Sequence, residues 1–129
     1  MIYSQYFTRI AVLVEIGNKS KAEELLRTAE KYALQSVATH MVLCAKAWMQ
    51  YLDNPDNAVR CLLEAECTNS DVRSLLEIAE AYIELSLHKA ACRRCIKKAI
   101  AAAETEEDQM RLQEFFSIYS SYKQLKFEE

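Results

Sequence analysis

Ala11, Ala45 and Ala79 stand 34 residues apart, and large apolar residues recur around them at the same interval. The recurring neighbours are Phe7, Met41 and Leu75, then Ile10, Cys44 and Ile78, and then Val14, Trp48 and Tyr82. A small residue flanked by large apolar ones, once in about 34 residues, is typical of stacked helical hairpins rather than of one globular core. The period therefore restricts the chain to similar units packed in a row, with Trp48 buried between hairpins.

The composition favours helices joined by short connectors. The 129 residues include one glycine and one proline, whereas sheets and long loops depend on these residues for their turns. A chain of this length is the size of one domain, and it can bury roughly two-thirds of its unfolded surface without disulfides or a metal. We therefore expect a single all-α domain that spans residues 1–129.

The hydrophobic pattern predicts three hairpins and one further helix. The first helices are expected at 3–16, 37–52 and 72–85, the second helices at 19–34, 56–67 and 89–104, and a terminal helix at 106–126. The corresponding repeats cover 3–36, 37–70 and 71–104. Several helix ends are visible: Gly17 ends the first helix, Pro55 suits a helix start, and Asp71 and Thr105 can act as N-caps.

This pattern resembles the tetratricopeptide repeat (TPR), which has large-x2-large-small-x2-aromatic in its first helix and small-x3-large-x2-small in its second. The matching residues are Met41, Cys44, Ala45, Trp48, Ala58, Leu62 and Ala65, followed by Leu75, Ile78, Ala79, Tyr82, Cys92, Ile96 and Ala99. The resemblance covers nearly the whole chain. It implies an all-α, right-handed solenoid of about three antiparallel helical hairpins plus a C-terminal helix, and a divergent member that lacks the family's proline near the repeat end.

The resemblance also implies a concave groove, lined by the face of each first helix that lies opposite its packed residues. The groove positions in this chain are Thr39, Val42, Lys46, Met49, Arg73, Leu76, Glu80, Ile83 and Glu84. They form a second apolar stripe with a polar rim, part of which packing against the adjacent repeat would consume. We expect a non-catalytic scaffold that binds a peptide or a partner helix in this groove.

An alternative interpretation places binding on the sixth predicted helix. Its segment 89–98 carries a basic cluster of Lys89, Arg93, Arg94, Lys97 and Lys98. Such a cluster could contact an acidic partner or nucleic-acid phosphates, although a solvated outer face has the same composition. The net charge of −3 and the lack of interleaved aromatic residues argue against nucleic acid.

A second alternative is a thiol or zinc site. His88, Cys92 and Cys95 follow an i, i+4, i+7 spacing that would place them on one helix face. Arg93 and Arg94 beside them would lower the thiol pKa values. Cysteine also packs as a small apolar residue, and a second ligand pair for structural zinc is lacking. We therefore expect no metal and no cofactor, and the absence of catalytic motifs predicts that the chain is not an enzyme.

The cysteines and the hydropathy bear on the compartment. Five cysteines, an odd number, are spread over the predicted helices without a signal peptide, which favours free thiols in a reducing, cytoplasmic environment. No run approaches the roughly 20 apolar residues of a membrane span, so we expect no membrane partner.

The terminal helix carries an aromatic face. Phe115, Tyr119 and Tyr122 are spaced by four and then three residues, and we expect nothing later in the chain to bury them. Exposed aromatic surface at the end of a stack often marks self-association. A homodimer through a terminal helix, or a place in a longer repeat array, would account for this face.

Overall fold

The structure is a computed structural model that describes residues 2–33 and 37–127. Of these residues 82% are helical and none lies in a strand, so the predicted all-α class is confirmed. The helices in chain order are α1 (Ser4–Glu15), α2 (Lys19–Tyr32), α3 (Ala38–Gln50), α4 (Pro55–Thr68), α5 (Val72–Glu84), α6 (Lys89–Ala102), α7 (Glu106–Ile118) and the 3-10 helix η1 (Ser120–Phe127).

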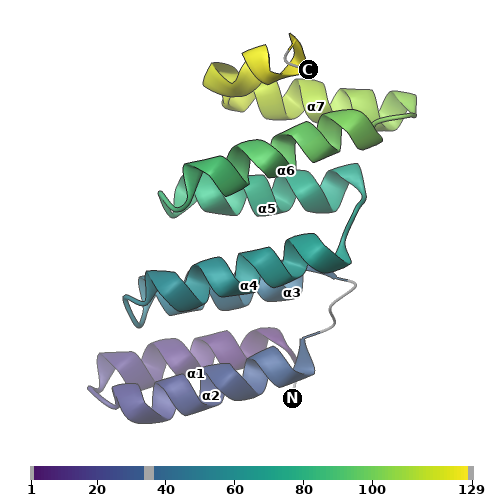
Figure 1. Ribbon diagram of the computed structural model, residues 1–129. Helices are drawn as coiled ribbons and strands as arrows, with labels where there is room; N and C mark the ends of the chain where they lie inside the picture. The colour runs from purple at the N-terminus through teal and green to yellow at the C-terminus, as the bar shows by residue number, and fades with distance from the viewer. Residues whose placement is uncertain (1, 34–36, 128–129) are drawn as a thin grey trace.

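The helices pair into hairpins that are stacked in chain order, as Figure 1 shows. α1 packs with α2, α3 with α4, and α5 with α6, while η1 lies against both α6 and α7. Neighbouring hairpins meet through the first helix of the later hairpin, because α3 contacts both α1 and α2, and α5 contacts both α3 and α4. Buried apolar side chains form one continuous cluster from Ile10 to Leu125.

The small and large residues of the sequence repeat occupy this core. Ala45 and Ala79 are fully buried, and so are the large rings of Trp48 and Tyr82. Alanine lets the helices approach closely, and the aromatic ring fills the space beside it. The predicted burial of Trp48 is confirmed, whereas Ala11 of the first repeat is only half-buried.

Side-chain caps fix where most helices begin. The capping residues are Asn18, Asn54, Asp71, His88 and Thr105, and each accepts a hydrogen bond from the backbone N–H three residues later. The predicted caps Asp71 and Thr105 are therefore confirmed, and Pro55 stands in the first turn of α4 as expected. The predicted end of the second helix at Leu34 and the repeat boundary at Ser36 lie outside the described residues.

The seventh helix is shorter than predicted. α7 ends at Ile118, and the chain then turns into η1 instead of continuing as one helix to residue 126. Tyr119 leaves the α-helical region with φ −112° and ψ 61°, and the following Ser120 and Ser121 are weak helix formers. η1 packs back onto α6 and α7 and buries Leu125, where the other hairpins place a second helix.

Each hairpin turn contains one residue with a positive φ. These residues are Gly17 at 85°, Asp53 at 48° and Ser86 at 53°. The turns at Gly17 and Ser86 close with the same hydrogen bonds: each of these N–H groups donates three residues back, and the next N–H donates five residues back. This helix ending favours glycine, so Ser86 carries a conformational cost that Gly17 avoids.

Ser86→Gly should raise the free energy of unfolding by about 1 kcal/mol, because glycine adopts a positive φ without strain. Gly17→Ala should lower it by about 1 kcal/mol through the backbone alone, since a Cβ at Gly17 would meet no atom within 4 Å. Urea unfolding followed by the fluorescence of Trp48 measures both changes. Equal stability of Gly17→Ala and the natural protein would show that the first turn is not left-handed in solution.

Candidate functional site

We call the exposed face of α3, α5 and α7 the first-helix surface. Two polar contacts cross it from α3 to α5. The Thr39 hydroxyl donates to a carboxylate oxygen of Glu77 at 3.1 Å, and the Lys46 ammonium lies 3.2 Å from a carboxylate oxygen of Glu84. Three predicted groove residues therefore lie on neighbouring helices as expected from their repeat positions, and their polar groups bind across the helix boundary.

The apolar stripe predicted for the groove is largely internal. Val42 is 4% exposed, so its predicted place in an open groove is wrong, and Leu76 is only 7% exposed. Met49 and Ile83 are half-buried against the core. The cause is the packing of α3 on α5 and of α5 on α7, which covers side chains that a single helix would expose.

A pocket of about 260 Å³ remains open between α5 and α7. Its lining residues are Arg73, Leu76, Glu77 and Glu80 from α5 and Arg111, Glu114, Phe115 and Ile118 from α7. Three of them are predicted groove residues, namely Arg73, Leu76 and Glu80. The Ile118 side chain is 69% exposed and supplies an accessible apolar group. The sequence pattern missed Ile118 because it assigned the outer face of the terminal helix to the aromatic residues.

Charges of both signs surround this pocket, with carboxylates in excess. Burial raises the pKa of Glu80, and the neighbouring carboxylate of Glu84 raises it further. Partly desolvated carboxylates that repel each other are stabilised when a cation approaches. The pocket is therefore suited to hold a segment that carries an apolar side chain and a positive charge.

The aromatic residues predicted to support self-association are turned inward. Phe115 is 5% exposed and belongs to the core cluster. Tyr119 and Tyr122 are half-buried, and Tyr122 lies in η1 beside Cys92 of α6. The expectation that nothing later in the chain covers this face is wrong, because η1 packs against α6 and α7.

The basic cluster on α6 is partly occupied by one buried carboxylate. Glu66 of α4 is 6% exposed and accepts two hydrogen bonds from Arg94, at 2.6 and 2.7 Å, and one from Lys98 at 2.7 Å. The hydrogen bonds from Arg94 hold the pKa of Glu66 at about 2, well below its ordinary value. Two cations of the 89–98 segment therefore bind within the chain rather than offering their charge to a partner.

A second carboxylate repeats this arrangement one hairpin earlier. Glu30 of α2 stands 36 residues before Glu66 and accepts hydrogen bonds from Arg60 at 2.7 Å and from Nε1 of Trp48 at 3.0 Å. Arg60 stands 34 residues before Arg94, so the same positions pair in both places. We call these two contacts the carboxylate bridges, and each joins the second helix of one hairpin to the next hairpin. The 34-residue pattern of apolar residues did not predict these bridges. A comparison of the Glu and Arg residues at equivalent repeat positions would have predicted them.

The three residues of the predicted thiol or zinc site do not converge. His88 is exposed and caps α6 from outside its first turn, while Cys92 and Cys95 are buried. Burial raises the pKa of Cys92 to about 11 and that of Cys95 to about 12; Arg93 and Arg94 lower these pKa values as expected, but burial outweighs them. Among the described residues, no group of three His, Cys, Asp or Glu side chains is placed to hold a metal ion.

Comparison of this chain with family models, curated proteins and solved structures finds no match. In the described parts of the chain, no helix combines the length and the apolar character needed to cross a membrane.

Glu66→Gln should lower the free energy of unfolding at pH 7 by about 3 kcal/mol, because it leaves Arg94 and Lys98 without their buried partner charge. The pKa of Glu66 is lowered from 4.5 to about 2, so its contribution is present above pH 4.5 and is lost as pH falls toward 2. The stability difference between the two proteins should therefore shrink over this range. Urea titrations at several pH values measure it.

Glu23→Gln is the matched control for that experiment, since Glu23 forms an exposed pair with Arg27 on α2. Its effect should stay below about 0.5 kcal/mol at every pH. Equal losses from the two substitutions would contradict a special role for Glu66.

One thiol should react rapidly and four slowly with a disulfide reagent at pH 8. Cys67 is exposed, whereas the other four cysteines are buried, and burial raises the thiol pKa of each of them. Cys67→Ser should remove the rapid phase and leave the slow reaction, which unfolding in urea would accelerate. Two or more rapid thiols in the natural protein would contradict the structure.

Proposed function

We propose that this chain is a divergent TPR-like, right-handed solenoid that acts as a non-catalytic protein-binding scaffold. The repeated positions of the sequence support the proposal because they also have repeated roles in packing. Trp48 and Tyr82 fill equivalent core sites, and Arg60 and Arg94 form equivalent bridges to the preceding hairpin. Stacked repeats of this kind present extended surfaces to partners.

The first-helix surface is the proposed binding face, and the open pocket between α5 and α7 is the observation that carries the proposal. It lies between neighbouring first helices, where the TPR resemblance predicts a binding groove, and its lining includes Arg73 and Glu80. The exposed Ile118 can pack against an apolar side chain of a bound peptide or helix. The surrounding carboxylates favour a basic residue beside that apolar group, so the partner is another protein or peptide.

The two alternative functions have less support. In the 89–98 segment, Arg94 and Lys98 are engaged by Glu66, which reduces the charge available for an acidic partner or nucleic acid. The thiol or zinc alternative would need His88 to turn toward two buried cysteines. Five cysteines without a disulfide fit a reducing compartment, and we propose the cytoplasm.

A photo-crosslinking amino acid placed at Ile118 should capture a discrete protein partner from a cell extract. The control places the same group at Leu63, which is 37% exposed on α4 and does not line the α5–α7 pocket. Capture at Ile118 should fall at least about tenfold when Glu114→Lys reverses the charge of an exposed rim carboxylate. Equal capture at both positions, or no effect of Glu114→Lys, would contradict binding at the first-helix surface.

A further inference from the structure

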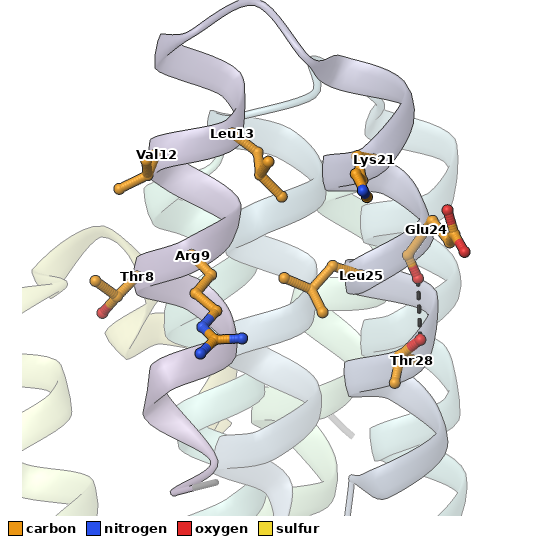
Figure 2. A pocket seen from close by; sticks show the side chains of 8 residues that line it. All are labelled: Thr8, Arg9, Val12, Leu13, Lys21, Glu24, Leu25 and Thr28. Atoms are coloured by element: carbon orange, nitrogen blue, oxygen red, sulfur yellow. Dashed lines mark hydrogen bonds between the residues drawn. The ribbon is translucent and has the colours of Figure 1, made fainter.

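The N-terminal end of the stack carries a second open pocket, of about 500 Å³, between α1 and α2. Figure 2 shows Val12 and Leu13 on α1 and Leu25 on α2 lining it, with charged side chains around them. Val12 is 50% exposed, and Ile10 is the one fully buried residue of α1. The first hairpin therefore leaves an apolar face open on its outer side.

In the second and third hairpins the equivalent face is covered by the preceding hairpin. Ala47 and Ala81 follow Leu13 at intervals of 34 residues, and both are buried. Cys61, 36 residues after Leu25, is fully buried and donates from its Sγ to Glu30 of the preceding hairpin at 3.4 Å. Leu13 and Leu25 thus lie on the surface that forms the two internal interfaces, without a hairpin packed on it, whereas Val12 stands at the repeat position of Lys46 and Glu80 on the first-helix surface.

The open face differs from the internal ones in its charge. The carboxylate bridges use Arg60 and Arg94 to receive Glu30 and Glu66 of the preceding second helix. The residue of α2 at that repeat position, 36 before Arg60, is Glu24, which lines the pocket together with the cations Arg9 and Lys21. A helix packed here in the internal manner would therefore meet a carboxylate where the internal interfaces offer a guanidinium.

We propose that the N-terminal face is a docking site for an amphipathic helix of another protein. The docked helix lays an apolar stripe over Val12, Leu13 and Leu25 and places a lysine or arginine opposite Glu24. That basic residue stands where Glu30 and Glu66 stand in the internal interfaces. The leucines fill more volume than the alanine and cysteine at the internal positions, so the apolar contact with the incoming helix is larger.

A second copy of the chain does not meet this requirement when stacked in the internal manner. Its Glu30 and Glu66 are already paired with Arg60 and Arg94 inside that copy, and α6 of its last hairpin carries Ile100 at the same repeat position. Ile100 has no charge to offer to Glu24. The site therefore takes a partner of different sequence, and it lies at the opposite end of the stack from the α5–α7 pocket, so it is independent of the proposed function.

Two synthetic, helix-stapled peptides test the proposal. Both have the sequence of residues 19–32, which packs on the second hairpin in the intact chain; one keeps glutamate at position 30 and the other carries E30K. Fluorescence anisotropy measures their binding to the full protein and to its Glu24→Arg variant. The E30K peptide should bind the natural protein at least about tenfold more tightly than the natural peptide, and Glu24→Arg should reverse this preference.

Further variants locate the contact. Val12→Asp places a charge in the apolar face at a position already half exposed, so it should abolish peptide binding without changing the thermal unfolding midpoint. Leu63→Asp, on the outer side of α4, should leave binding unchanged. No binding of either peptide, or a preference that Glu24→Arg leaves unaltered, would overturn the proposal. So would a dimer in light scattering that Val12→Asp converts to a monomer, because a second copy would then occupy the face.

Discussion

Two carboxylates, Glu66 buried and Glu30 partly buried, set the spacing between the hairpins of this chain. The Glu66 side chain is 4% exposed and is held by Arg94 and Lys98 from the next second helix. A charge removed from water costs several kcal/mol unless donors surround it, so α4 and α6 are stable only where these donors reach. Alanines and cysteines at the neighbouring core positions let the helices come that close. Apolar packing supplies the driving force, and the carboxylate bridges select one relative position among those that packing would permit.

The bridges also explain which surfaces stay open. At the C-terminal side, α6 carries Ile100 at the position of Glu30 and Glu66, and α7 with η1 closes the stack by apolar contact. At the N-terminal side, Glu24 occupies the arginine position and no hairpin covers it. Between these ends, the first-helix surface is crossed by pairs such as Lys46 with Glu84. The molecule therefore has two kinds of exposed site, one along the row of first helices and one on the terminal face.

Local signals in the sequence were enough to predict where the seven α-helices lie, the caps at Asp71 and Thr105 and the burial of Trp48. Each depends on residues within one or two turns, and the 34-residue period aligned them. Val42 was misplaced because its burial depends on how closely neighbouring first helices pack, which a single-helix pattern does not contain. η1 was missed for a similar reason: its return path depends on Leu125 and Tyr122 finding sites on distant helices. The carboxylate bridges were not predicted because each joins charged residues that are far apart in the sequence.

The two carboxylate bridges differ in the number of their charged hydrogen bonds, so the coupling between hairpins differs along the stack. Glu66 has three charged hydrogen bonds, whereas Glu30 is more exposed and shares its oxygens with Arg60 and the neutral donors Trp48 and Cys61. In a row of units that couple only to their neighbours, thermal opening begins where coupling is weakest. The first hairpin is that point, since α1 has one fully buried residue and an uncovered outer face. Amide hydrogen exchange should therefore be fastest in α1 and slower in the later hairpins. A helix docked on the outer face of the first hairpin would slow exchange in all of the hairpins.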